Sequence, residues 1–425
     1  MARLEYHNVS AANDSGRINE GSKRKSAAAR FWGRIKEGFK SSYMKAGLLF
    51  SLSLASSSCF ESSGMLLTDG PKGKQDTVAS DGIKKDSGLD GNKDTRFAEG
   101  IGADLAPSWW DKSWKTRAAC SVNTTVSSSL KDFPAHCLLD TATLISSSKM
   151  DSNCKDIRVM APDNITQLSY EIESGTCNTA NTVIWFKIPL TSGAQDYKAW
   201  IYYGNSLASD AQNIKDVWTE FSDVWHLSEA SGNTFFSSTG LNDLSLSGSV
   251  TRLSGSKCKF GGCISTGSGM LSVSSTTYQS LADLTVRCWV YQTDKSGYQT
   301  IIAQRDSNLH WSLYTHTNIG ELSFHGTSQY PSYTTLTLNA WVHALARVSS
   351  SSTSEVFKDG TKIYGPSQYS YGAVASVLTL SGYSGSERFQ GTMDECRISK
   401  SAISDDWLKA ELSQTHALGS EENSP

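Results

Sequence analysis

Two adjacent acidic residues, Asp394 and Glu395, are the first candidates for chemistry, because glycan hydrolysis uses a pair of carboxylates. Neighbouring residues of a strand point to opposite faces, so we do not expect these two to act on one substrate. The sequence contains no Glu-x-Asp-x-x-Glu, His-Glu-x-x-His or Gly-x-Ser-x-Gly pattern and no phosphate-binding loop. We therefore assign no catalytic residue and expect a protein that is not an enzyme.

Aromatic residues give a better indication of binding chemistry. Tyrosines gather in turn-rich stretches around Pro331 and Pro366. Exposed rings stack on sugar faces, and nearby Ser, Asn and Asp side chains bind sugar hydroxyls. The alternative is that Trp311 and some of the tyrosines pack the core. The candidate ligand-binding residues are Trp311, Tyr314, Tyr330, Tyr333, Tyr369 and Tyr371.

Cysteines divide evenly along the chain once Cys59 is set aside, with four in each half of the part beyond it. An even number in an exported chain indicates disulfides, and metal ligation or free thiols are the alternatives. A hairpin, two consecutive strands, a short glycine-containing loop and two core-facing strand positions each bring one pair together. The candidate pairs are Cys120 with Cys137, Cys154 with Cys177, Cys258 with Cys263, and Cys288 with Cys396.

The segment 44–58 has the organisation of a signal peptide: Lys45, an apolar run and small residues before Cys59. It resembles a bacterial lipoprotein signal, which implies that Cys59 is lipidated and anchors the chain in a membrane. Ser56 stands where such signals prefer Leu, and ordinary cleavage near Ala55 is the alternative. The basic extension 1–43 is either untranslated or an overlong start of the signal.

Charge and composition exclude further classes. The 425 residues have room for two or three domains and carry a formal charge of −3. Met1 to Lys45 holds ten basic and four acidic residues, which leaves −9 on the remainder. We therefore expect no nucleic-acid partner. No stretch of about twenty apolar residues predicts a membrane-spanning helix, and the polar segment 59–107 is predicted to be a disordered tether.

Short alternating apolar runs separated by turn residues predict β-strands throughout the rest of the chain. The first set spans 116–122, 136–139, 156–160, 168–172, 182–188 and 197–203. The second set includes 284–291, 311–315, 321–325, 341–348, 356–358, 362–364 and 377–380, with Asp359-Gly360 as a hairpin turn. One helix is expected at 405–412. The fold class is therefore all-β, with two antiparallel β-sandwich modules.

The first module, 108–215, resembles a bacterial and archaeal surface domain of unknown function that often precedes laminin-G-like modules. The likeness rests on these motifs in order: Trp110-x-x-x-Trp114-x-x-Arg117, Asp156-Ile157-Arg158-Val159, Tyr170-Glu171-Ile172-Glu173, Ile184-Trp185-Phe186 and Ile201-Tyr202-Tyr203-Gly204-Asn205. No catalytic residue comes with that family.

The second module, 222–413, resembles the laminin-G-like, concanavalin A-like jelly rolls. The motifs are Val224-Trp225-His226-Leu227, Leu284-Thr285-Val286-Arg287-Cys288-Trp289-Val290, Trp341-Val342-His343, Lys358-Asp359-Gly360 and Gly391-Thr392-Met393-Asp394-Glu395-Cys396-Arg397. The residues 414–425 are predicted to be a disordered tail.

These resemblances imply a lipid-anchored protein of the outer membrane or cell surface that binds a glycan or a surface protein. Relatives often hold Ca²⁺ at the sandwich rim, although no ligand for it can be assigned here, and no other cofactor is expected. The same architecture serves lectins, adhesins and glycosidases. A polysaccharide-processing enzyme and a structural envelope protein without a dedicated ligand are the alternatives.

Overall fold

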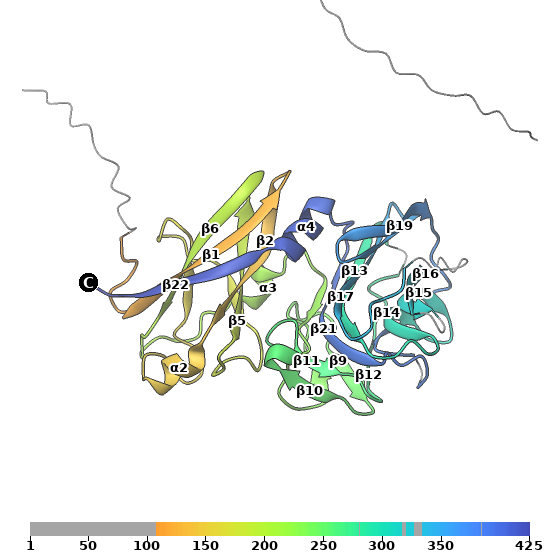
Figure 1. The fold of residues 1–425 in the computed structure, drawn as a ribbon, viewed down its shortest axis with the longest axis horizontal. Coiled ribbons are helices and arrows are strands. Elements are labelled where there is room, and N and C mark those ends of the chain that lie inside the picture. The colour runs from red at the N-terminus through yellow and green to blue at the C-terminus, as the bar shows by residue number, and fades with distance from the viewer. Residues whose placement is uncertain (1–107, 280, 317–319, 327–333, 384) are drawn as a thin grey trace, which may run out of the picture. The chain divides into compact units, whose positions relative to one another are not determined.

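The computed structural model describes residues 108–425 except 280, 317–319, 327–333 and 384. The extension, the signal peptide, Cys59 and the tether therefore lie outside the described residues. The described part is built almost entirely from antiparallel strands, which confirms the all-β class (Figure 1). Its helical pieces are α2 (Thr141–Ser146), α3 (Ile214–Val217), α4 (Asp405–Ser413) and the 3-10 turn η1 (Gly255–Lys257).

The first module contains two sheets, in the orders β22-β1-β6-β3 and β2-β5-β4. Apolar side chains that alternate along these strands form the core between the sheets. The strands are β1 (Thr116–Val126), β2 (Leu130–Leu139), β3 (Arg158–Met160), β4 (Tyr170–Ile172), β5 (Thr182–Leu190), β6 (Gly193–Tyr203) and β22 (Thr415–Asn423).

The second module packs a sheet of the order β10-β11-β21-β13-β17-β18-β19, with β7 beside β21, on a sheet of the order β16-β15-β14-β20-β12-β9-β8. Its strands are β7 (Asp223–Trp225), β8 (Thr234–Phe235), β9 (Leu244–Ser247), β10 (Thr251–Ser254), β11 (Gly262–Ser265), β12 (Met270–Ser274), β13 (Leu284–Gln292), β14 (Gln299–Arg305), β15 (Leu309–His316), β16 (Glu321–His325), β17 (Trp341–Ser349), β18 (Thr353–Lys358), β19 (Thr361–Gln368), β20 (Val377–Leu380) and β21 (Gly391–Ser399).

The sheet that contains β13 is buried on both faces. Val286 and Cys288 point into the core of the second module. Leu345 of β17 and Phe357 of β18 instead belong to the core cluster of the first module. Helix α4 joins that cluster through Trp407, whose ring lies 5.3 Å from the ring of Phe133. The two modules therefore share an apolar contact, which explains the burial of side chains on the outer face of this sheet.

Local signals placed two elements as expected. The predicted helix is α4, and the Ser404 side chain caps it by accepting a hydrogen bond from the backbone N–H of Trp407. The predicted hairpin joins β18 to β19 through Asp359 and Gly360, which have φ of 49° and 75°. A two-residue turn needs this left-handed backbone at both positions, and glycine adopts it without a Cβ penalty.

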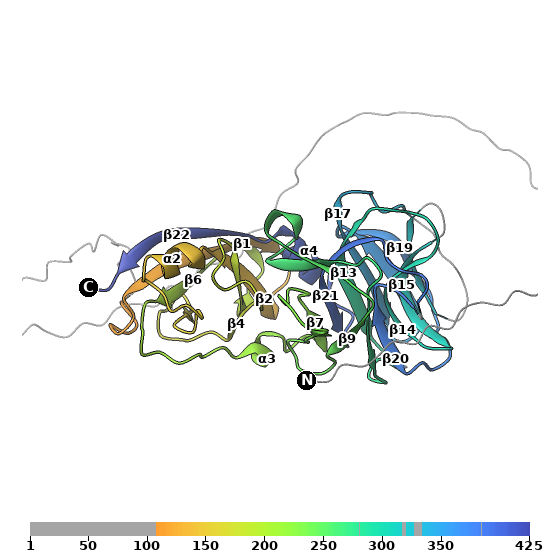
Figure 2. The ribbon, with the colours of Figure 1, turned by 90° about the horizontal axis from the view of Figure 1, so that it is seen from below.

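The predicted tail at 414–425 is wrong, because 415–423 forms β22. This strand pairs with β1 in antiparallel register, from Thr116 opposite Asn423 to Asn123 opposite Thr415. Figure 1 and Figure 2 show β22 lying along β1, although the two strands are far apart in the sequence. Its side chains are mostly exposed, so the segment has little apolar pattern, and the edge of β1 supplies the hydrogen bonds that order it.

All four disulfides form in the predicted pairs. Cys120 joins Cys137, and Cys154 joins Cys177, inside the first module. Cys258–Cys263 closes a short loop with a sequence separation of 5, and Cys288–Cys396 closes one of 108. Among the described residues, no helix is long and apolar enough to cross a bilayer.

Truncation of the chain after Gln414 tests the role of β22. We expect the free energy of unfolding to fall by about 2 kcal/mol or more, because seven paired positions and two ion pairs are lost, at about 1 kcal/mol for each net hydrogen bond. One ion pair joins Arg117 Nη2 to Glu422 Oε2 at 2.8 Å, and the other joins Lys149 to Glu421. Urea unfolding followed by tryptophan fluorescence measures the change. Glu422→Gln, which removes the first ion pair alone, is the control and loses less. Equal stability of the truncated and full chains would contradict the role of β22.

Candidate ligand-binding sites

The structure corrects one predicted ligand-binding residue. Trp311 is 0% exposed and lies in the core of the second module. Its Nε1 donates a hydrogen bond to the carbonyl of Tyr278 at 3.2 Å. Strand alternation explains the error, because the face of β15 that carries Trp311 and Leu313 is the inner face, whereas Tyr314 lies on the outer face.

The other predicted tyrosines fall into three groups. Tyr330 and Tyr333 lie outside the described residues. Tyr369 and Tyr371 are partly buried against the second core, with ring centroids 5.2 Å apart, and Tyr371 stacks on His310 at 4.8 Å. Tyr314 lines a pocket.

A pocket of about 180 Å³ opens on the outer face of the sheet that contains β14, β15 and β16. Tyr298 is 40% exposed, and its ring centroid lies 6.1 Å from that of Tyr314. Arg305 Nη1 and Glu387 Oε2 form an ion pair at 2.7 Å. We call this the sheet-face pocket, and its described lining is Tyr298, Arg305, Leu309, Ser312, Tyr314, His325 and Glu387.

The sheet-face pocket is polar as well as aromatic. The Oγ of Ser312 is buried and makes no hydrogen bond within the described part of the chain. Burial and the positive charge of Arg305 lower the pKa of His325, so its imidazole is neutral at neutral pH. The described lining therefore contains one cation, one carboxylate, three hydroxyl groups and a neutral imidazole.

A buried group of charges joins the two modules. We call Glu171, Glu173, His226, Glu395 and Arg397 the junction cluster. His226 Nδ1 lies 2.5 Å from Glu395 Oε1 and its Nε2 lies 3.3 Å from Glu171 Oε2. Arg397 Nε donates to Glu395 Oε2 at 3.0 Å. Glu171 and Glu173 come from the first module, and the other three residues come from the second. The net charge that each module contributes to the cluster is therefore balanced by the other module.

Burial and neighbouring charges set the protonation of this cluster. Burial by itself lowers the pKa of His226, but the carboxylates of Glu395 and Glu171 outweigh it and hold that pKa well above 6.5. Burial raises the pKa of Glu173 to about 8, although the charge of His226 opposes the shift. The charges of His226 and Arg397 overcome the burial of Glu395 and lower its pKa to about 2. His226 is therefore charged and Glu173 protonated at neutral pH.

The adjacent carboxylates of β21 have structural partners. The register between β13 and β21 shifts at Glu395, which has φ of 49°, so β21 carries a bulge that aims Glu395 at His226. Asp394 Oδ2 accepts hydrogen bonds from the backbone N–H groups of Lys259 and Phe260, at 2.8 and 3.0 Å. Asp394 therefore fixes the loop that the Cys258–Cys263 disulfide closes.

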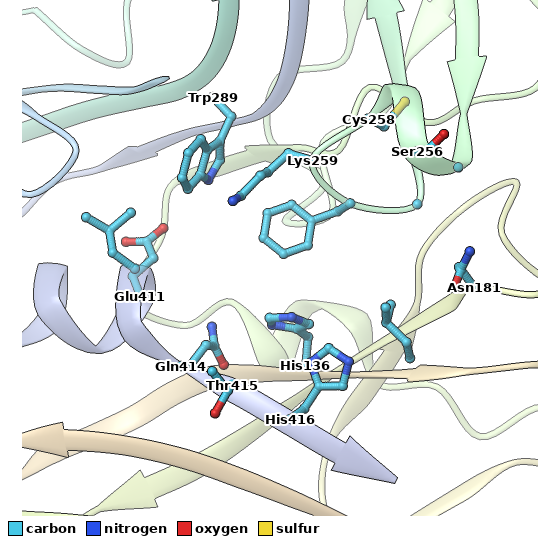
Figure 3. A pocket seen from close by; sticks show the side chains of 15 residues that line it. His136, Asn181, Ser256, Cys258, Lys259, Trp289, Glu411, Gln414, Thr415 and His416 are labelled. Atoms are coloured by element: carbon cyan, nitrogen blue, oxygen red, sulfur yellow. The ribbon is translucent and has the colours of Figure 1, made fainter. Parts of the chain in front are cut away.

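A second, larger pocket lies between that loop, β13, α4 and the first module. Its volume is about 580 Å³, and we call it the junction pocket. Figure 3 shows Lys259 and Trp289 on one side and His136, Gln414 and His416 on the other. Lys259 Nζ lies 4.1 Å from the Trp289 ring centroid.

Two groups of described residues bring metal-ligating atoms together: Cys258, Cys263 and Asp394, and Glu173, His226 and Glu395. The first group contains a disulfide. In the second, His226 is hydrogen-bonded to carboxylates. Ca²⁺ takes six to eight oxygen ligands, and neither group supplies such a shell. Neither of these two groups therefore forms a Ca²⁺ site by itself.

Sequence reasoning did not select Tyr298, Arg305, Lys259 or Trp289 as site residues. One signal was available for Trp289. Its strand alternates with core-facing residues at 284, 286, 288 and 290, so an aromatic residue at 289 had to lie on the outer face. The other residues meet only through the tertiary fold.

Two sequence families match the chain. The domain of unknown function DUF2341 matches residues 153–233, which include Glu171, Glu173 and His226. The concanavalin A-like lectin/glucanases superfamily matches residues 265–409, which include most of the second module. The order of the two agrees with the prediction. No curated protein matches the chain.

Solved structures show distant likeness in fold. Domain 4 of AbnA, a GH43 extracellular arabinanase from Geobacillus stearothermophilus, in complex with arabinotriose, has a TM-score of 0.37 and 16% identity, over 46% of this chain and 98% of that domain. Trypanosoma rangeli sialidase in complex with the inhibitor DANA has a TM-score of 0.37 and 9% identity, over 54% of this chain and 42% of the sialidase. The binding domain of Paraclostridial Mosquitocidal Protein 1 has a TM-score of 0.36 and 15% identity, over 47% of this chain and 52% of that one.

The junction cluster makes stability depend on pH. A charged His226 stabilises the fold below pH 6.5, and this contribution is lost as the pH rises toward its raised folded pKa. The raised pKa of Glu173 has the same effect, because the folded chain holds this proton up to about pH 8 and the unfolded chain releases it at lower pH. We therefore expect the free energy of unfolding to fall as the pH rises from 6.5 to about 8. In His226→Gln the slope should be smaller by about 1.4 kcal/mol per pH unit.

Urea unfolding at a series of pH values measures this slope. His316→Gln, which changes a histidine outside the cluster, is the control and should keep the slope of the unsubstituted chain. Identical slopes in His226→Gln and the unsubstituted chain would show that His226 does not carry the charge.

Proposed function

We propose that this chain, which carries a DUF2341 domain followed by a concanavalin A-like domain, is an exported bacterial envelope protein that binds glycans in the sheet-face pocket. The four disulfides support export, because such bonds persist in oxidising compartments. Lipidation of Cys59 and anchoring in the outer membrane or at the cell surface complete the proposal.

The observation that carries the proposal is the pairing of exposed aromatic surface with charged hydrogen-bonding groups. Tyr298 presents an exposed ring beside Tyr314. A sugar ring packs its C–H face on such a ring, while its hydroxyls bond to charged and polar groups at the edge. The Arg305 guanidinium can donate to a sugar oxygen, and the Glu387 carboxylate can accept from a hydroxyl. Together these groups suit a neutral glycan.

The chemistry of the pocket supports binding over hydrolysis. Among its described lining residues, Glu387 is the single carboxylate. Glu387 is engaged by Arg305 and also accepts a hydrogen bond from Thr300 Oγ1 at 3.1 Å. Most glycosidases use two carboxyl groups that flank the scissile bond. A ligand here would meet recognition groups without that pair of carboxyl groups.

A glycan array probed with the full chain tests the proposed function. We expect saturable binding to at least one neutral glycan, and Tyr298→Ala should weaken it roughly ten-fold because it removes the stacking surface. The ring of Tyr298 is exposed, so its removal leaves the core intact.

Phe236→Ala is the matched control, since Phe236 is 59% exposed and lies outside the sheet-face pocket. This variant should bind glycan as the unsubstituted chain does. Each array is run once with Ca²⁺ and once with a chelator, which shows whether binding depends on Ca²⁺. An array without binding would contradict the proposal and favour a protein ligand or a structural role. Release of shortened glycan would favour the enzyme alternative.

A further inference from the structure

The junction pocket is a built cavity, because both modules contribute walls that other contacts hold in place. Asp394 fixes the backbone of Lys259 and Phe260. Glu173 of the first module accepts a hydrogen bond from the backbone N–H of Gly262 at 3.2 Å. Gly261 packs so closely on the first module that a Cβ would lie 2.8 Å from Glu173 Oε1. The loop therefore presents its side chains to the pocket in a set position.

Glu411 Oε2, a polar atom of the lining, has no hydrogen-bond partner within the described part of the chain, whereas the His136 and Gln414 side chains are hydrogen-bonded to each other. His136 is 7% exposed, and the side chain of Glu411 is 10% exposed. A buried acceptor without a donor costs free energy, and a ligand that brings donors recovers it.

The charges around these atoms indicate what kind of donor they would accept. Arg287 and Arg397 bond to Glu411 Oε1 and, against the effect of burial, lower the pKa of Glu411, so its carboxylate is ionised. Burial and the positive charges of His416 and Arg397 lower the pKa of His136 to about 3, so it is neutral. The oxygens of Glu411 and Gln414 therefore face the ligand. The Glu411 carboxylate and the Lys259 ammonium, which lines the same pocket, balance each other, so an uncharged ligand fits this lining.

Aromatic surface lies opposite these acceptors. Trp289 and Phe260 line the same pocket, and the His136 ring meets the Phe260 ring edge-on at 5.1 Å. The volume of about 580 Å³ falls within the roughly 300 to 1,000 Å³ of small-molecule sites. A purely apolar ligand would leave the acceptors unsatisfied. A ring with one apolar face and several hydroxyl donors satisfies both walls.

We propose that the junction pocket is a second ligand site that binds an uncharged pyranose ring, with its hydroxyls on Glu411 and Gln414 and its apolar face on Trp289 and Phe260. This site is separate from the sheet-face pocket and does not depend on it. It gives the first module a direct role, since His136 and the residues of β22 form one wall.

The test uses the full chain and a panel of methyl pyranosides with glucose, galactose, mannose and N-acetylglucosamine configurations. Saturation-transfer NMR detects binding, and calorimetric titration gives the affinity. We expect at least one pyranoside to bind, and Trp289→Ala and Gln414→Leu each to weaken it roughly ten-fold. Gln414→Leu nearly preserves side-chain volume, so it carries the test if Trp289→Ala does not fold.

Trp341→Ala is the matched control, because Trp341 lies on β17 beside β13 and outside the junction pocket. It should leave the affinity unchanged. Three results would overturn the proposal: no pyranoside binds, binding survives both junction variants, or only Tyr298→Ala reduces it. The last result would assign the binding to the sheet-face pocket. If the sheet-face pocket binds no glycan but a pyranoside still binds and the junction variants weaken it, the junction site is supported and the proposed function is not.

Discussion

The contact between His226 and the carboxylates on both sides of it is the constraint on which the arrangement of the two modules depends. A buried charge is stable only when its partners are in place, and removing one partner is far more damaging than replacing the whole group with apolar residues. Glu171 comes from the first module and Glu395 from the second, and Trp185 and Trp218 cover the imidazole and the Arg397 guanidinium. Separating the modules would expose an unbalanced set of charges on each surface.

This cluster also accounts for the geometry of the junction pocket. The bulge that aims Glu395 at His226 lies one residue after Asp394, which holds the loop carrying Lys259 and Phe260. Arg397 binds Glu395 on one side and Glu411 on the other. The same strand therefore joins the modules and orders two walls of the cavity, so the ion pairs and the pocket share one set of supports.

Features with a local cause could be predicted from sequence. The Asp359-Gly360 turn and the Ser404 cap act over a few residues, and cysteine position along strands indicated the disulfide pairs. β22 could not be predicted, because its exposed side chains carry little pattern and its partner strand is distant in sequence. Trp311 was misplaced because alternation gives two faces without saying which one is inner. Both pockets combine residues from remote segments, and their membership follows from packing, which leaves no local trace in the sequence.

The pairing of β1 with β22 makes the first module discontinuous in the chain. All strands of the second module lie between these two, so that module is a contiguous unit inserted between two strands of the first. The edge of β1 waits for a partner about three hundred residues later, a separation that makes its closure slow. Until β22 pairs, β1 has an unpaired edge that can pair with another chain, so the last residues of the first module also protect it from association.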